Sequence, residues 1–248
     1  MSDPDIRIGT AGWAIPARHA AHFPEEGGGL VRYATRFKAA EINSSFYRRH
    51  KPETYSRWAA AVPDGFRFAV KVPKAITHER RLADSAEPLD WFLAEIAGLG
   101  AALGPLLVQL PPSLAFDAAV AGAFFDALRV RYDGLVACEP RHVSWFDRDA
   151  DALLIHNQVA RVGADPARAP MAAVPGGWPG LAYWRLHGSP RMYFSEYGAD
   201  FLADLAKRLA GAAVEAWCMF DNTASGAALG DALTLQNLVC SARPPEQA

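Results

Sequence analysis

Residues 66–72 read FRFAVKV, a short run in which bulky apolar side chains recur at every second position. Side chains of a β-strand point to its two faces in turn, so Phe66, Phe68 and Val70 share one face while Lys71 lies on the other. A strand that is apolar along almost its whole length is typical of a parallel sheet covered by helices. The run therefore predicts a buried parallel strand that carries a lysine near its carboxyl end.

Seven further strand-like runs accompany this one, with helical patterns between them. Parallel neighbours need a crossover connection, so alternating strands and helices predict βα units, and eight such units close a barrel. The expected strands span Ile6–Gly9, Ala39–Asn43, Phe66–Val72, Leu106–Leu110, Leu135–Glu139, Gln158–Gly163, Ala182–His187 and Ala216–Asp221. We therefore predict the α/β class and a single (β/α)8 TIM barrel.

The segments between the strands carry helix signals. Pro52 opens one helical pattern and Asp117 caps another. The stretch 165–180 is rich in Pro, Ala and Gly, which predicts a long loop with little regular helix after the sixth strand. A length of 248 residues suits one barrel. We expect one domain over residues 1–240 and a frayed tail over residues 241–248.

Composition is that of an ordinary globular protein, with 51% hydrophobic and 21% charged residues. The net charge of −2 and the lack of a long basic run do not indicate nucleic-acid binding through a cationic surface. Three widely spaced cysteines give neither a disulfide framework nor a zinc pattern, and no signal peptide or membrane span is recognisable. We expect a soluble, cytoplasmic protein, with a monomer favoured.

Alternation on the other strands brings polar side chains to one end of the barrel. On each strand the bulky apolar residues take the face toward the helices, and the remaining residues point inward. The inward polar set is Glu41, Asn43, Lys71, Gln109, Glu139, Arg185, His187 and Asp221. TIM-barrel enzymes build their active sites at the carboxyl ends of the strands. Because isolated buried charges are costly, the set indicates either a functional pocket or a salt-bridge network that merely closes the barrel.

The motifs that carry these residues resemble one known family. They are GTAGW at 9–13, EINSSFYR at 41–48, PET at 52–54 with Trp58, FRFAVK at 66–71, ITH at 76–78, QLPP at 109–112, EPR at 139–141 with Trp145, RLHG at 185–188 and FDN at 220–222. On these motifs the chain is identified as a member of the domain-of-unknown-function 72 family, also called YecE-like. The resemblance implies a β/α barrel of this size and leaves the activity open.

Residues 14–19 depart from the family pattern, in which a Tyr and a Trp often follow the first Gly-Trp. The resemblance therefore implies no particular substrate contact from this loop.

Basic residues dominate the expected rim of the pocket. The cationic set is Lys71, His78, Arg141, Arg185, His187 and Arg191. Arginine binds phosphate or carboxylate through two parallel hydrogen bonds. The loops at 188–189 and 222–226 follow the last two strands, where barrels often hold phosphate. The pattern favours a small anionic ligand.

Carboxylates on three strands point to acid–base chemistry, with Glu41 and Glu139 as the leading bases. We predict that Lys71, Arg141 and Arg185 hold the anion. The predicted catalytic residues are Glu41, Lys71, Glu139, His187 and Asp221. The predicted substrate-binding residues are Trp13, Asn43, Tyr47, His78, Gln109, Arg141, Trp145, Arg185, Tyr193 and Asn222. The aromatic members either stack on a ring-shaped substrate or pack as part of a lid.

Two other chemistries use the same residues. Glu41, Glu139, His187 and Asp221 could ligate a divalent ion, as in barrel phosphodiesterases, but the basic neighbours oppose a cation. We therefore predict no metal and no cofactor. Lys71 could form a Schiff base if burial lowered its pKa, an effect that Glu41 would counter.

The sequence thus predicts an enzyme of the hydrolase, lyase or isomerase class that acts on a small anionic or sugar-like substrate by acid–base catalysis. One alternative is a metal-dependent phosphodiesterase that acts on nucleic acid or nucleotides. The other is a binding protein that senses a metabolite without catalysis.

Overall fold

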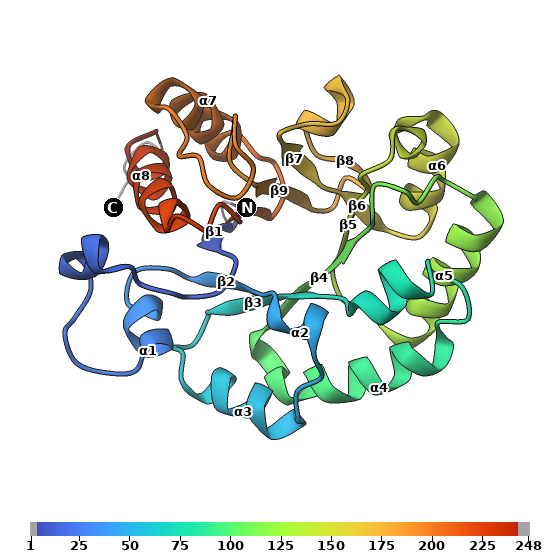
Figure 1. The fold of residues 1–248 in the computed structure, drawn as a ribbon, viewed down its shortest axis with the longest axis horizontal. Helices are drawn as coiled ribbons and strands as arrows, with labels where there is room; N and C mark the ends of the chain where they lie inside the picture. Colours follow the sequence, from blue (N-terminus) through green and yellow to red (C-terminus); the bar gives the residue numbers. More distant parts are fainter. Residues whose placement is uncertain (1–3, 243–248) are drawn as a thin grey trace.

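The computed structural model describes residues 4–242, which form a barrel of parallel strands surrounded by helices (Figure 1). The wall strands, in order around the barrel, are β1 (Ile6–Thr10), β2 (Ala39–Ile42), β3 (Arg67–Lys71), β4 (Leu103–Gln109), β5 (Val136–Glu139), β6 (Val159–Arg161) with β7 (Gly163–Asp165), β9 (Ala182–Leu186) and β10 (Ala216–Phe220). These are the strands expected from the sequence, and the fold is a TIM barrel. The short β8 (Gly176–Gly177) pairs antiparallel with β6.

Two hydrogen-bonded ladders make up the wall and meet at two junctions. Residues 159–165 run from β6, which pairs with β5, into β7, which pairs with β9. At the second junction, between β1 and β2, the Gly12 N–H donates to the Glu41 carbonyl at 2.8 Å. There the Tyr33 hydroxyl accepts from the Thr10 N–H (2.9 Å) and donates to the Ala39 carbonyl (3.1 Å). A side-chain hydroxyl thus takes the place of a ladder bond.

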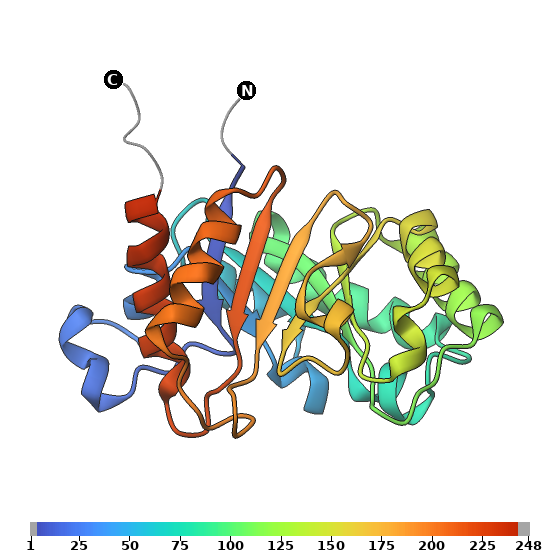
Figure 2. The same cartoon turned by 90° about the horizontal axis from the view of Figure 1, so that it is seen from above.

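Helices cover the outside of the wall, and α7 and α8 lie side by side on one flank (Figure 2). The α-helices are α1 (Gly29–Ala34), α2 (Ser44–Tyr47), α3 (Pro52–Ala60), α4 (Ala86–Ile96), α5 (Ala118–Arg131), α6 (Arg148–His156), α7 (Ala199–Ala210) and α8 (Ala227–Ala242). Short helical turns are η1 (Ala17–His22), η2 (Ala75–Glu79), η3 (Ala97–Ala102), η4 (Val143–Phe146) and η5 (Pro170–Ala173). The Asp117 side chain accepts from the N–H groups of Ala119 (2.9 Å) and Val120 (3.0 Å), as its capping role predicts.

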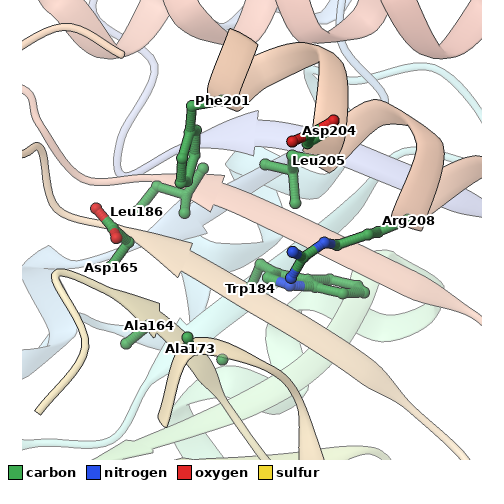
Figure 3. Close-up of a pocket in the computed structure, with 10 residues that line it drawn as sticks. Ala164, Asp165, Ala173, Trp184, Leu186, Phe201, Asp204, Leu205 and Arg208 are labelled. Carbon is green, nitrogen blue, oxygen red and sulfur yellow. The ribbon is translucent and has the colours of Figure 1, made fainter. Parts of the chain in front are cut away.

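The segment between β7 and β9 contains η5 and β8 but no α-helix among its described residues. This agrees with the loop predicted from the Pro, Ala and Gly content of 165–180. A cavity of about 180 Å³ lies beside this segment, against the outer face of β9 (Figure 3). Trp184, Leu186, Phe201 and Leu205 supply its apolar walls. It lies on the helix side of the wall, because Trp184 and Leu186 belong to the outer core.

Two hydrophobic clusters show which way each strand residue points. The outer cluster lies between wall and helices and includes Phe68, Val70 and Cys138. The inner cluster fills the barrel and consists of Ala39, Ala69, Leu107, Ala137, Ala160, Val162, Leu181, Tyr183, Trp217 and Met219. Tyr183 and Trp217 stack within it, with ring centroids 6.1 Å apart. The barrel is therefore packed through its centre, and polar groups are left to one end.

The end of the last helix differs from the expected boundary of the barrel domain. Helix α8 continues to Ala242, so the expected tail over 241–248 begins two residues too early, and its remainder, 243–248, lies outside the described residues. Leu238 and Val239 pack on the outer core, which keeps the end of the helix in place. Between residues 4 and 242, no helix combines the length and the apolar character needed to cross a membrane.

Candidate active site

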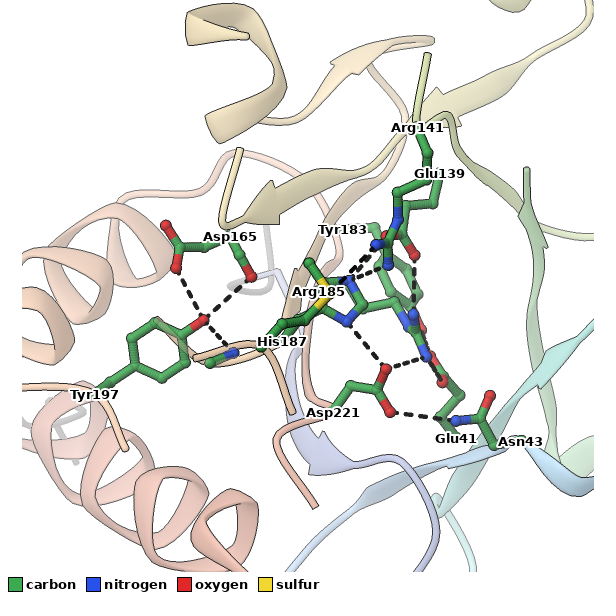
Figure 4. A network of polar contacts seen from close by, with 12 residues as sticks. Glu41, Asn43, Glu139, Arg141, Asp165, Tyr183, Arg185, His187, Tyr197 and Asp221 are labelled. Atoms are coloured by element: carbon green, nitrogen blue, oxygen red, sulfur yellow. Dashed lines mark hydrogen bonds and ion pairs between the residues drawn. The ribbon is translucent and has the colours of Figure 1, made fainter. Parts of the chain in front are cut away.

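Six of the inward polar residues contact one another at the carboxyl ends of the strands (Figure 4), namely Glu41, Asn43, Glu139, Arg185, His187 and Asp221. Most of the inward polar residues lie two positions beyond an apolar inward residue of the same strand, as Glu41 does beyond Ala39 on β2 and Arg185 beyond Tyr183 on β9. Asn43 and His187 instead follow Glu41 and Arg185 by two positions. Glu41, Glu139 and Arg185 are 0% exposed. Strand alternation therefore brings these charges together in a layer directly above the apolar interior.

Arg185 stands at the centre of this layer. Its Nε and Nη2 contact the carboxylate of Glu41 at 2.7–3.2 Å, Nη1 lies 3.0 Å from Glu139 Oε2, and Nη2 lies 3.0 Å from Asp221 Oδ2. Burial opposes the charge, but the carboxylates of Asp221, Glu41 and Glu139 raise the pKa of Arg185 above its ordinary value. The sequence suggests a substrate contact for Arg185. The structure instead commits this guanidinium to three carboxylates, and drawing it away would leave buried charges unpaired.

His187 lies between the carboxylates of Asp221 and Glu139. Its Nδ1 lies 3.0 Å from Asp221 Oδ2, and its Nε2 lies 2.8 Å from Glu139 Oε1. Arg141 closes this side, with Nε 2.8 Å from Glu139 Oε1 and Nη2 2.9 Å from His187 Nε2. Burial disfavours the Glu139 carboxylate, yet the charges of His187, Arg141 and Arg185 hold its pKa well below the usual range. An imidazole between two carboxylates offers a path for a proton between Asp221 and Glu139.

Lys71 lies at the end of β3 and is 5% exposed. Among the described residues no carboxylate comes within ion-pair distance of its ammonium, which instead lies 4.1 Å from the centre of the Phe46 ring. Burial, followed by the charge of Arg185, lowers the pKa of Lys71 to about 8. Glu41 acts in the opposite direction, as the sequence predicts. Burial, which is the largest cause, and the charge of Arg185 together outweigh the effect of Glu41.

His78 and Arg141 lie within electrostatic reach of each other and of Lys71, and both carry N–H groups. His78 faces the Phe46 ring edge-on at 4.9 Å, and its Nδ1 lies 2.9 Å from Thr77 Oγ1. Burial and then the charges of Lys71 and Arg141 lower the pKa of His78. Nη1 of Arg141 contacts the Met192 sulfur at 3.9 Å rather than a carboxylate. Three basic groups therefore converge with donor capacity left over.

Other expected substrate contacts lie beside the network. The Asn43 Nδ2 donates to Asp221 Oδ1 (3.3 Å), whereas its buried Oδ1 has no partner. Gln109 is paired with Glu139 across β4 and β5. Tyr193 approaches the His187 ring edge-on, with ring centroids 5.9 Å apart. These residues could contact a ligand that enters at the carboxyl ends of the strands.

Four expected contacts have other surroundings. Trp13 packs edge-on against Trp58 (5.3 Å) and Phe68 (6.0 Å), on the helix side of the wall. Trp145 is 1% exposed and its indole N–H donates to the Leu114 carbonyl at 3.0 Å. The last two are Tyr47, which is 70% exposed, and Asn222, whose Nδ2 donates to Asp231 Oδ2 at 2.7 Å. The structure does not bring these four side chains into the network.

Sequence reasoning missed one residue of the network, Tyr183, and one buried carboxylate outside it, Asp231. Tyr183 donates from its hydroxyl to Glu41 Oε2 at 3.2 Å and shares the inward parity of Arg185, so the same alternation could have found it. Asp231 lies on α8, where it accepts from Asn222 and from the Tyr197 N–H. Burial raises the pKa of Asp231 to about 6. No sequence signal marks Asp231, because its partners come from distant segments.

The arrangement gives the metal alternative no support. Among residues 4–242, no group of three or more His, Cys, Asp or Glu side chains is placed to hold a metal ion. The oxygens of Glu41 face Arg185, and both ring nitrogens of His187 face carboxylates. A cation at this point would have to displace a guanidinium group.

Fold and site together define a TIM-barrel protein with a salt-bridged polar cluster at the carboxyl ends of its strands. The chain matches the family described as "protein of unknown function DUF72" over residues 7–248, and it belongs to this family. It is 26% identical over 137 residues to the UPF0759 protein YecE of Escherichia coli K12, covering 55% of this chain and 50% of that protein. The chain thus spans about half the length of the curated relatives it matches.

Solved structures agree with this assignment. A DUF72 family protein from Enterococcus faecalis superimposes with a TM-score of 0.79 at 24% identity, covering 98% of this chain and 99% of the other. A DUF72 family protein from Thermotoga maritima gives a TM-score of 0.78 at 23% identity, with 95% and 99% covered. A xylose isomerase domain protein from Alicyclobacillus acidocaldarius gives 0.51 at 14% identity, with 96% and 100% covered. These likenesses show the fold alone.

Proposed function

We propose that the chain is an enzyme that binds a small anionic substrate at the carboxyl ends of the barrel strands and transforms it by acid–base catalysis. The carrying observation is the convergence of Lys71, Arg141 and His78 beside a cluster whose carboxylates are already paired. A guanidinium, an ammonium and an imidazole suit phosphate or carboxylate oxygens. The unpartnered Asn43 Oδ1 would accept a hydroxyl of the same substrate.

The proton-transfer roles differ from those the sequence suggests. Glu41 is buried and hydrogen-bonded to Arg185 and Tyr183, so we assign it to positioning Arg185 rather than to base catalysis. Asp221 keeps 7% exposure, the largest of the three carboxylates of the cluster, and contacts His187 Nδ1. In this proposal Asp221 exchanges a proton with the substrate, and His187 carries the proton between Asp221 and Glu139.

Binding of small anions to the purified protein tests the first half of the proposal. Calorimetry would use inorganic phosphate, short sugar phosphates and small carboxylates against the unmodified chain and the variants R141A and H78A. We expect each variant to bind at least about tenfold more weakly, because each loses a charge-assisted hydrogen bond. R57A, on the outer helix α3, is the matched control and should bind as the unmodified chain does.

Three results separate this proposal from its rivals. Equal affinity in the unmodified chain and both variants would overturn the anion site. Tight binding without turnover of any bound compound would favour the metabolite-binding alternative. Stoichiometric metal in protein purified without chelators or a histidine tag, together with cleavage of a phosphodiester, would favour the phosphodiesterase.

A further inference from the structure

Lys71 differs from the other charged groups of the cluster in having no ionic partner within residues 4–242. The carboxylate of Glu41 is held by Arg185, that of Glu139 by Arg141 and Arg185, and that of Asp221 by Arg185 and His187. Among the described residues, none of these carboxylates is within 4.0 Å of the Lys71 ammonium. A lysine without an ion pair can lose its proton and leave no buried negative charge uncompensated.

The surroundings of Lys71 hold the amine in place while keeping it reachable. The Ser45 hydroxyl donates to the Lys71 carbonyl at 2.6 Å, which fixes the end of β3. The face of the Phe46 ring lies 4.1 Å from the ammonium and holds the end of the side chain in place. The residue retains 5% exposure at the end of the barrel where a ligand would enter. The charged groups that influence it come from β2, β5, β9, the end of β10 and the turn η2, and they are Glu41, Glu139, Arg185, Asp221 and His78.

We propose that Lys71 forms an imine with the carbonyl group of a small anionic oxo compound, such as an oxo acid or a phosphorylated aldehyde or ketone. This inference rests on the proposed function, since Arg141 and His78 would hold the anionic group of the same molecule. It goes further by naming a carbonyl as the reacting group and a covalent intermediate as the route. Desolvated lysines in apolar pockets are known to act in this way.

The step balances without a further reactant. The lone pair of the neutral Lys71 amine attacks the carbonyl carbon, the C=O π electrons move to oxygen, and one proton passes from the new ammonium nitrogen to that oxygen to give a neutral carbinolamine. A second proton then converts the hydroxyl to water, which leaves as the C=N bond forms. Overall, a ketone or aldehyde and the lysine ammonium give a protonated imine and one water. The charge of Lys71 lowers the pKa of Asp221, so the two lie within electrostatic reach, and Asp221 with His187 is placed to carry these protons.

Reductive trapping tests the inference directly. The full chain is incubated with pyruvate, glyoxylate or dihydroxyacetone phosphate in the presence of sodium cyanoborohydride. Intact mass should increase by the mass of one probe less one oxygen atom, and peptide mapping should place the adduct on Lys71. The K71R variant should lose this adduct. The K74R variant should keep the adduct, because Lys74 is an exposed lysine three residues after Lys71.

The pH dependence and the R141A variant give two further readouts that do not rely on K71R folding well. Trapping at Lys71 should rise with a midpoint near pH 8, whereas an ordinary exposed lysine titrates near ~10.4. The R141A variant should trap the anionic probes at least about tenfold more slowly than the unmodified chain does. Labelling of Lys71 no faster than that of Lys74 would overturn the inference.

The outcomes also separate this inference from the proposed function. If small anions bind in an Arg141-dependent manner but no probe is trapped on Lys71, the imine is wrong and the anion site stands. If neither binding nor trapping occurs, both proposals fall.

Discussion

Two basic residues of the same cluster have opposite electrostatic situations. Arg185 forms ion pairs with three carboxylates, and its charge is favoured by its surroundings. Among the described residues no carboxylate lies within ion-pair distance of Lys71, and burial followed by the charge of Arg185 disfavours its charged form. A charge that a protein keeps at a cost in stability is a marker of function rather than of folding. Lys71 is therefore the residue of the cluster for which a purely structural explanation is weakest.

Replacing Lys71 with Met should stabilise the protein. Because burial lowers the pKa of Lys71 from 10.5 to about 8, folding pays a penalty for the charged form, and we expect K71M to raise the free energy of unfolding at pH 7 by roughly 1–3 kcal/mol. Between pH 8 and 10.5 the folded chain has released this proton while the unfolded chain retains it, so the stability of the unmodified protein rises there. The gain from K71M should shrink over the same interval.

Urea denaturation at pH 7 and at pH 10 measures both quantities. K74M, which removes an exposed lysine paired with Glu79 at 3.2 Å, is the control and should change stability by less than about 0.5 kcal/mol. A loss of stability in K71M at pH 7 would contradict the interpretation of Lys71 as an unpaired buried charge.

At the scale of elements, the junction between β1 and β2 depends on a side chain from a helix. Tyr33, on α1, is 0% exposed, and its hydroxyl bridges the Thr10 N–H and the Ala39 carbonyl. Gly9 makes this close approach possible, since a Cβ at that position would lie 2.2 Å from the Ala39 carbonyl oxygen. The barrel therefore closes here through a tyrosine hydroxyl and a glycine rather than through a regular ladder.

Replacing Tyr33 with Phe should weaken this junction. The Thr10 N–H and the Ala39 carbonyl would each lose a buried partner, so we expect Y33F to lower the free energy of unfolding by about 1–3 kcal/mol. Thermal denaturation would measure the change, and hydrogen exchange at Thr10 should accelerate. Y47F is the matched control, because the Tyr47 side chain is 70% exposed. Equal stability of Y33F and the unmodified protein would show that the hydroxyl bridge is dispensable.

Over the whole molecule, the buried cluster connects distant parts of the chain. Glu41 on β2 and Glu139 on β5 both pair with Arg185 on β9, and Asp221 follows β10. Each ion pair is therefore a contact between opposite or neighbouring sides of the barrel. Breaking a buried pair by removing one partner is strongly destabilising because the other charge is left alone.

Acid should destabilise the protein through this cluster. The pKa values of Glu139 and Asp221 lie below their ordinary values of 4.5 and 3.8. The unfolded chain consequently binds more protons than the folded chain in that range, so their contribution is complete above about pH 4.5 and is lost as the pH falls. Asp231 has a raised pKa of about 6 and acts in the opposite sense between pH 3.8 and 6.

The E139Q variant isolates the first effect. At pH 7 it should unfold with about 3–5 kcal/mol less free energy, since Arg141 and Arg185 lose a buried partner. Its difference from the unmodified protein should narrow below pH 4.5. D204N, which removes an exposed partner of Lys207, is the control. Denaturation curves from pH 3 to pH 7 would measure this. A difference in the free energy of unfolding between E139Q and the unmodified protein that does not change with pH would show that Glu139 is not the titrating group.

The sequence alone was sufficient to determine the strands, the TIM barrel and the direction in which each strand residue points. These properties follow from local alternation, which depends only on strand geometry. The same alternation predicted that six charged or ionisable residues lie at one end of the barrel, namely Glu41, Lys71, Glu139, Arg185, His187 and Asp221.

Only the tertiary structure decided which of these charges are paired. Arg185 could have faced a ligand, but it bonds three carboxylates, and Lys71 could have paired with Glu41, but it lies on Phe46. Pairing depends on distances across the barrel between residues up to 144 positions apart. A periodic pattern along one strand contains no information about these distances. Trp13 and Trp145 lie outside the site for a similar reason. Their packing partners come from other segments of the chain, which the pattern of one strand does not reveal.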